Sequence, residues 1–182
     1  MSGANAGIVS VTGPIEVLPT PPASVAPGAL ATNGLIHAFV EREAVQLGND
    51  LVVNILQPGS TTTYHPDRFD LASVDPGVLP AGTTVNCYLF HHNPATGAMT
   101  IGPGTVTFSE RILGLILFPD DLDATDAALG APGTVYGPYT GNRGLGTNAS
   151  YPDDVLTLSG DGHTLTIDNL WTSGPILVDQ LR

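Results

Sequence analysis

Residues 155–168 have the sequence Val-Leu-Thr-Leu-Ser-Gly-Asp-Gly-His-Thr-Leu-Thr-Ile-Asp. Apolar and polar side chains alternate on both sides of the central Gly160-Asp161-Gly162. A period of two places successive side chains on opposite faces of a strand. An Asp-Gly pair also tolerates the positive φ angles of a type I′ turn. The stretch therefore predicts a β-hairpin, with strands over residues 155–159 and 163–168.

Short runs with strand character occur along the rest of the chain, bounded by turn-forming residues. They cover residues 35–41, 51–56, 83–90, 105–108, 112–118 and 175–182. Residues 112–118 are apolar on both faces, which predicts a central strand. The chain has 22 glycines and 16 prolines, and no strand is followed by a convincing crossover helix. The pattern favours an all-β fold, an antiparallel β-sandwich or jelly roll, over a parallel α/β sheet.

One segment has helical character. Asp120 and Asp121 suit a helix N-terminus, alanines and leucines follow, and Gly130 precedes Ala131-Pro132. Carboxylates favour the first turn of a helix, and glycine commonly ends one. We expect one short helix near residues 121–129, between strands.

The N-terminal fifth of the chain differs from the remainder. Five prolines between Pro14 and Pro27 forbid helix and remove backbone hydrogen-bond donors. A disordered leader is one interpretation, but interspersed apolar residues such as Ile15 and Val25 favour an arm docked on the domain. The predicted organisation is an extended arm over residues 1–33 and a β-sandwich domain over residues 34–182.

Composition excludes several classes of partner. The 182 residues include 17 acidic and 5 basic ones, for a net charge of −12, and no lysine. Five scattered arginines cannot neutralise the phosphates of nucleic acid or of an anionic membrane. No apolar run approaches the roughly 20 residues of a membrane span, so no membrane insertion is expected. The single cysteine, Cys87, cannot form an internal disulfide, and strand alternation points it into the core.

Several motifs resemble a group of secreted bacterial proteins, many of them of the PEP-CTERM-sorted type. The group has the motifs "FEE", "IPAGTVV", "ILGVI", "LDASDALLGAPGTTYP", "RGLE" and "DQIRV" in this order. The matching segments are residues 39–43, 80–85, 112–116, 122–136, 143–145 and 179–182. The resemblance implies an exported, surface-associated β domain of unassigned activity. It departs where Gly146 replaces the glutamate of "RGLE", and where no sorting helix or basic tail follows Arg182.

Clustered acids suggest one candidate site. Carboxylates at Asp120, Asp121, Asp123 and Asp126 are the hard oxygen ligands that Ca²⁺ prefers. Their spacing is not that of an EF-hand, which has a glycine at its sixth position and a glutamate at its twelfth. The alternative is a helix N-terminus whose dipole favours acids in the first turn.

A long irregular loop, residues 133–151, suggests a second candidate site. Tyrosines can stack on sugar rings while polar side chains bond the hydroxyls, so a glycan is a possible ligand. The residues of this site are Tyr136, Tyr139, Asn142, Arg143 and Tyr151. The alternative is that the tyrosines cover the end of the sandwich and that Arg143 pairs with an acid such as Asp126 or Asp179.

Catalytic signals are weak. The chain lacks a Gly-x-Ser-x-Gly nucleophile motif, and adjacent His91 and His92 would point to opposite faces of a strand rather than share a Zn²⁺. We expect a non-catalytic, extracellular or cell-surface, structural or adhesive module, self-assembling as an oligomer or filament through strand edges in the arm and the C-terminal strand. The alternatives are a Ca²⁺-supported glycan-binding module and a carbohydrate-active enzyme with two facing carboxylates.

Overall fold

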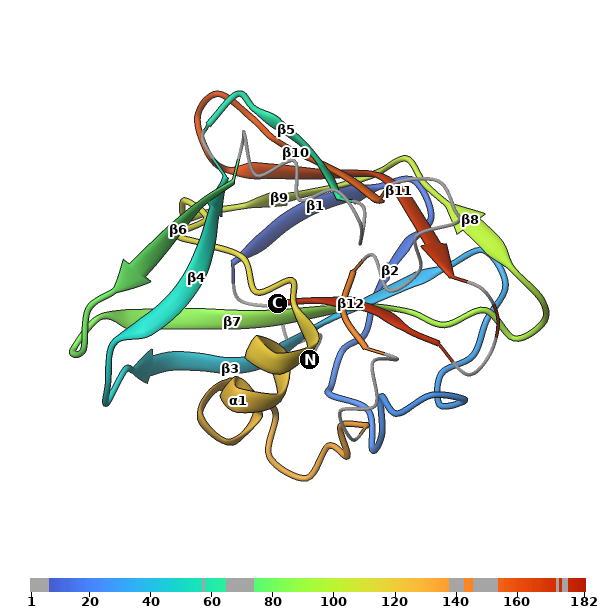
Figure 1. Ribbon diagram of the computed structural model, residues 1–182, viewed down its shortest axis with the longest axis horizontal. Coiled ribbons are helices and arrows are strands. Elements are labelled where there is room, and N and C mark those ends of the chain that lie inside the picture. The colour runs from blue at the N-terminus through green and yellow to red at the C-terminus, as the bar shows by residue number, and fades with distance from the viewer. Residues whose placement is uncertain are drawn as a thin grey trace.

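The chain forms an all-β, sandwich-like fold with one short helix, as the sequence predicts (Figure 1). The computed structural model describes residues 7–56, 58–64, 74–137, 143–145, 154–172, 174 and 177–182. Within these residues no helix is long and apolar enough to cross a membrane.

The larger sheet has the strand order β1-β9-β11-β10-β5, with β8 also paired to β11. All its pairs are antiparallel. Its strands are β1 (Ile8–Thr12), β5 (Thr61–Tyr64), β8 (Met99–Ile101), β9 (Gly104–Phe108), β10 (Asp154–Leu158) and β11 (Thr164–Thr172).

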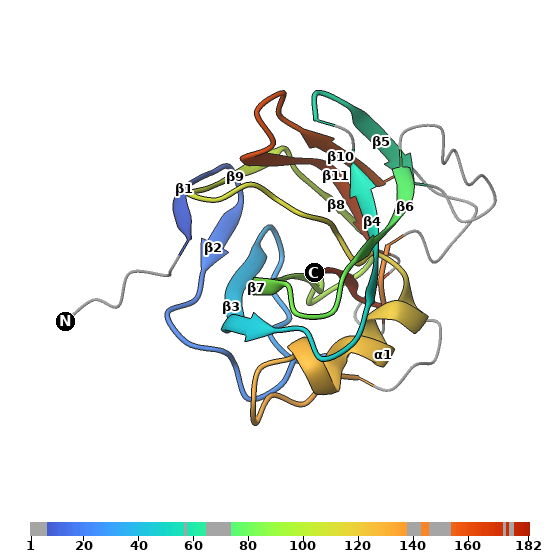
Figure 2. The ribbon, with the colours of Figure 1, turned by 90° about the vertical axis from the view of Figure 1, so that its left-hand side faces the viewer.

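The second sheet has the order β12-β7-β3-β2, in which only the β2–β3 pair is parallel. Its strands are β2 (Ile15–Val17), β3 (Ile36–Gln46), β7 (Thr84–His92) and β12 (Asp179–Leu181). A separate ribbon of β4 (Leu51–Leu56) and β6 (Val74–Leu79) runs along one side between the two layers (Figure 2).

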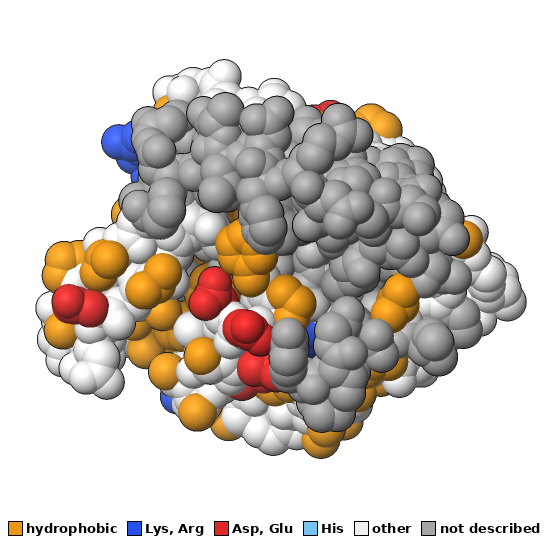
Figure 3. All heavy atoms as spheres, in the orientation of Figure 1, with side chains coloured by type: hydrophobic (Ala, Val, Ile, Leu, Met, Phe, Trp, Pro, Cys, Tyr) orange, Lys and Arg blue, Asp and Glu red, His pale blue; other side chains and the backbone are white. Residues whose placement is uncertain are grey.

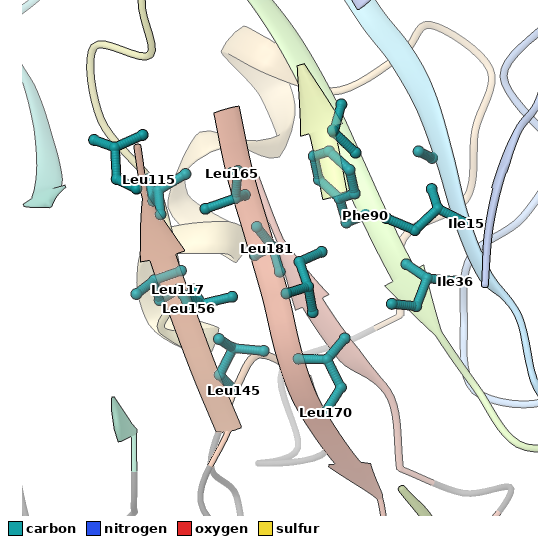
Figure 4. Close-up of a cluster of buried hydrophobic side chains, with 14 of the residues drawn as sticks. Ile15, Ile36, Phe90, Leu115, Leu117, Leu145, Leu156, Leu165, Leu170 and Leu181 are labelled. Atoms are coloured by element: carbon teal, nitrogen blue, oxygen red, sulfur yellow. The ribbon is translucent and has the colours of Figure 1, made fainter. Parts of the chain in front are cut away.

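Two clusters of apolar side chains cover the two faces of the second sheet. Between the layers, Leu156 and Leu165 of the larger sheet face Ile36 and Phe90 of the second (Figure 4). The other face packs against helix α1 (Pro119–Leu129) and the arm, in a cluster that includes Phe39, Leu89, Leu122 and Val25. Burial on both faces explains why β3 is buried at four successive residues.

The hairpin predicted over residues 155–168 is confirmed as β10–β11. Its turn is not type I′, because Gly162 is its only residue with a positive φ (+77°). Here the Gly162 amide donates to the Ser159 carbonyl.

The predicted helix is also confirmed, with Asp120 and Asp121 in its first turn. Phe118 is the N-cap and contributes no side-chain hydrogen bond, while Gly130 ends the helix in an extended conformation.

The central strand predicted over residues 112–118 is wrong. This segment makes a single bridge to β4, where Leu115 and Asn54 exchange both backbone hydrogen bonds. Ile116 then exchanges bonds with Arg182, and the Leu117 carbonyl accepts from the Leu145 amide. Most of the segment is buried or half-buried because three different parts of the chain contact it, although Leu113 is 47% exposed. Its backbone groups therefore pair with several separate neighbours rather than along one strand.

The arm contributes to both layers. Within residues 7–33, β1 pairs with β9 of the larger sheet and β2 with β3 of the second. Val25 is completely buried, and its amide donates to the Val135 carbonyl. Cys87 is buried, as its position in the strand pattern predicts.

We expect Gly13→Ala to destabilise the fold more than Gly28→Ala. Both glycines have positive φ, +72° and +86°, so an alanine at either costs about 1 kcal/mol of backbone strain. At Gly13 the added Cβ would also lie 2.3 Å from the Pro103 carbonyl oxygen, whereas nothing lies within 4 Å at Gly28. Urea unfolding should show a further loss of about 1–3 kcal/mol for Gly13→Ala. Equal losses would contradict the close approach of β1 and β9.

Candidate functional site

Five charged side chains from β3, helix α1, residue 143 and the residue after β12 form a largely buried network, here called the charge cluster: Glu41, Asp123, Asp126, Arg143 and Arg182. Glu41 stands at its centre, with a fully buried side chain on β3. The register between β3 and β7 shifts between Val40 and Arg42. A bulge of this kind redirects a side chain, and Glu41 lies within it.

Arg182 neutralises Glu41 through two parallel hydrogen bonds. Its Nε donates to Glu41 Oε2 at 2.5 Å and its Nη2 to Oε1 at 2.9 Å. This bidentate geometry is the strongest arrangement for an arginine and a carboxylate. Arg182 also donates to Thr125 Oγ1 and to Asp126 Oδ1 on helix α1. The residue after β12 thus joins β3 to the helix.

Arg143 binds the same helix. It donates to Asp123 at 2.7 Å, and to both oxygens of Asp126 at 2.6 and 2.8 Å. Its Nε donates to the side-chain oxygen of Gln180 on β12. Asp126 therefore accepts from both arginines and links the two halves of the cluster.

Both guanidinium groups lie near the ring of Tyr136. Its centroid is 5.1 Å from the Arg143 Cζ and 5.7 Å from the Arg182 Cζ, within cation–π range. The Tyr136 hydroxyl donates to Glu41 Oε1 at 2.6 Å and accepts from the Ala131 amide. Burial, followed by the nearby charge of Glu41, raises the pKa of Tyr136, so the phenol stays protonated.

The Cys87 thiol donates to Glu41 Oε2 at 3.3 Å. Burial and the adjacent Glu41 carboxylate raise its pKa well above the usual value. Burial opposes the charge of Arg182, but the hydrogen bonds and charge of Glu41 outweigh it and raise the pKa of Arg182. The thiol is therefore protonated, which is unsuited to nucleophilic attack, and the arginine is firmly charged.

Gln180 extends the network along β12. Its side-chain amide lies 2.9 Å from His91 Nδ1 and donates to the Val25 carbonyl of the arm. His91 Nε2 lies 3.2 Å from the Ala29 carbonyl. These contacts place the proton of His91 on Nε2 and leave Nδ1 as acceptor. Burial lowers the pKa of His91 to about 3, so the ring is neutral at neutral pH.

The structure separates the predicted calcium ligands into two pairs. Asp123 and Asp126 bind arginine. Asp120 and Asp121 occupy the first turn of α1, and burial followed by the charge of Asp120 raises the pKa of Asp121. Figure 3 shows acidic side chains gathered over the surface where Figure 1 draws α1. Among the described residues, no three His, Cys, Asp or Glu side chains are grouped to hold a metal ion.

Two members of the predicted glycan site, Tyr136 and Arg143, meet inside the charge cluster. The predicted pairing of Arg143 with Asp126 is present, whereas Asp179 lies opposite His92 on β7. The other members, Tyr139, Asn142 and Tyr151, lie outside the described residues.

Sequence reasoning missed the roles of Glu41, Cys87, Gln180 and Arg182. One usable signal was the scarcity of cations, since only the five arginines can give a buried acid a permanently charged partner. A second signal was the position of Glu41. It lies two residues after Phe39, so strand alternation places it on the same face as that apolar side chain. The segments quoted for the family resemblance supply every member of the cluster, from residues 39–43, 122–136, 143–145 and 179–182.

We expect Arg182→Met to lower the free energy of unfolding by about 3–5 kcal/mol, because it leaves the Glu41 carboxylate buried without a cation. Adding Glu41→Leu should restore much of this loss, since no unpaired charge then remains. Arg111→Met is the matched control, because Arg111 is exposed and pairs with no described residue; it should change stability by less than about 0.5 kcal/mol. If urea unfolding gave similar losses of stability for Arg182→Met and Arg111→Met, the structural role of the cluster would be contradicted.

We expect His91 to make the fold sensitive to acid. Below pH 6.5 the unfolded histidine binds a proton, whereas native His91 stays neutral down to about 3. Acidification through this window therefore favours the unfolded state, by up to about 1.4 kcal/mol per pH unit. The His91→Gln variant should lose stability less steeply between pH 6.5 and 3 than the wild type. Parallel curves, or an NMR titration of the His91 ring near pH 6.5, would contradict this.

Comparison of the chain with protein-family models, curated proteins and solved structures gives no match. What it does must therefore be inferred from its own residues.

Proposed function

We propose that this chain is a non-catalytic structural or adhesive module of the cell surface or extracellular space, and that its copies associate through a sheet edge. The observation that carries the proposal is the charge cluster, in which the groups best suited to chemistry are bound to one another. Asp126 accepts hydrogen bonds from Arg143 and Arg182, and Glu41 accepts two from Arg182. With their oxygens engaged in this way, these carboxylates are poorly placed to exchange protons with a substrate.

The cluster instead fastens distant parts of the chain together. Through Glu41, Asp126 and Gln180 it connects β3, helix α1, β12 and the arm. Removing one of the two arginines leaves carboxylates of the cluster without their cation, which is costly for a buried group. Such an arrangement suits a module that must keep one shape outside the cell.

Strand β1 offers an edge for association. It borders the larger sheet, its residues include neither charge nor proline, and Val9 is 66% exposed. Natural edge strands are usually protected by charge, proline or cover. The C-terminal strand, the other edge expected from the sequence, is covered instead: β12 is fully buried, and Ile116 bonds to the backbone of Arg182.

The alternatives are less well supported. Of the residues predicted for a Ca²⁺-supported glycan-binding module, Asp123, Asp126 and Tyr136 are engaged by arginines. Asp120 and Asp121 are not engaged by any described arginine. A carbohydrate-active enzyme would need two facing carboxylates free to share work on a glycosidic bond. In the charge cluster, Glu41 and Asp126 are already bridged by Arg182.

We expect the purified chain to gain mass with concentration in light scattering, and Val9→Lys to keep it monomeric. A lysine in the middle of an edge strand opposes strand addition by its charge. Val52→Lys is the matched control, since Val52 is also exposed, at 58%, but lies on the β4–β6 ribbon. It should associate like the wild type.

A wild type that stays monomeric at the highest attainable concentration would overturn the assembly proposal. Equal association of wild type and Val9→Lys would place the interface elsewhere than β1.

A further inference from the structure

A cavity of about 570 Å³ lies between β7, residues 110–116 and the β4–β6 ribbon. Its volume falls within the roughly 300–1,000 Å³ typical of small-molecule sites. The wall is mainly apolar, and its residues include Leu51, Val53, Leu79, Val85, Phe108 and Leu115. In Figure 3, apolar side chains gather on the side of the molecule where Figure 1 draws β4 and β6.

Backbone hydrogen bonds fix residues 110–116, one wall of the cavity, in place. Leu115 is bonded in both directions to Asn54 of the ribbon, and the Ile112 amide donates to the Gly162 carbonyl of the β10–β11 turn. At Gly114 the segment touches the ribbon so closely that a Cβ would lie 2.6 Å from Val53. With both ends fixed, the segment cannot collapse onto β7 without losing these bonds. The cavity is thus preformed.

Polar groups occur where the lining reaches the surface. Glu110 and Arg111 are exposed members of the lining, and His163 is a half-buried one. The Arg111 guanidinium lies beside the turn, its Nε 3.1 Å from the place of a Cβ on Gly162. It forms no hydrogen bond or ion pair with any described residue.

Arg111 differs in this from the other arginines that the structure describes. Arg143 and Arg182 are paired with carboxylates, and Arg42 donates to the Gly130 carbonyl that follows the helix. Of the four arginines that the structure describes, Arg111 is the one whose guanidinium bonds to no described residue. Its place at the rim of an apolar cavity complements a ligand with an apolar body and an anionic head.

We propose that this cavity binds a small amphipathic carboxylate, with its apolar body between β7 and the β4–β6 ribbon and its carboxylate on Arg111. The inner wall includes Cys87 and Arg182. Both are engaged by Glu41, so they offer no charge or nucleophile to the ligand. Binding is therefore non-covalent and leaves the charge cluster intact.

The test compares dodecanoate with dodecanol by calorimetry, below the micellar concentration of dodecanoate and the solubility limit of dodecanol. We expect the wild type to bind dodecanoate more tightly. Arg111→Gln should weaken dodecanoate binding about tenfold, the value of one charge-assisted hydrogen bond, and leave dodecanol binding unchanged. Glu110→Gln is the matched control, a neighbouring rim residue of opposite charge, and should not weaken dodecanoate binding.

Filling the cavity tests the apolar part of the site. Val85 and Leu79 are half-buried lining residues on β7 and β6, so Val85→Trp and Leu79→Trp provide two independent variants. Each variant that keeps wild-type circular dichroism should lose binding of both ligands. The proposal is overturned if the wild type binds neither ligand, if filling the cavity leaves binding unchanged, or if Arg111→Gln weakens both ligands equally.

Discussion

The buried ion pair between Glu41 and Arg182 is the contact on which the rest of the structure depends. An ionised carboxylate with no exposed surface is stabilised when a cation and further donors reach it. Arg182, Tyr136 and Cys87 supply these donors from three distant parts of the chain. The end of β12, the segment after helix α1 and the middle of β7 must therefore all be in place before Glu41 is satisfied.

A pair of this kind specifies an arrangement more than it adds stability, since desolvation offsets much of the Coulomb attraction. In this fold it sets how α1 lies on the second sheet. Asp126 of the helix binds both Arg143 and Arg182, so moving the helix along the sheet would break the hydrogen bonds that join both arginines to this shared acid. Apolar packing of Leu122 and Leu129 in the same cluster as Phe39 stabilises the contact between the helix and the sheet. The charged contacts determine where along the sheet the helix lies.

The sequence predicted features whose cause is local. The alternation around Gly160-Asp161-Gly162 predicted the β10–β11 hairpin, and the acids before an alanine-rich stretch predicted α1. It failed where an apolar run has several neighbours. Residues 112–118 have the composition of a buried strand, yet their backbone hydrogen bonds are divided among β4, Arg182 and Leu145. The pattern of apolar residues reports which side chains are buried. A continuous apolar run does not distinguish a buried strand from a buried irregular segment.

The candidate site likewise combines features with local causes and features that depend on distant parts of the chain. Composition alone determined that this acidic chain has few cations and folds as β structure, because charge and strand period are properties of neighbouring residues. Only the tertiary structure decided that two of those cations are buried with Glu41 and Asp126, while Arg111 stands at the rim of an apolar cavity. These residues are separated by up to 141 positions. Packing of the two sheets and the helix brings them together, and no local pattern encodes that contact.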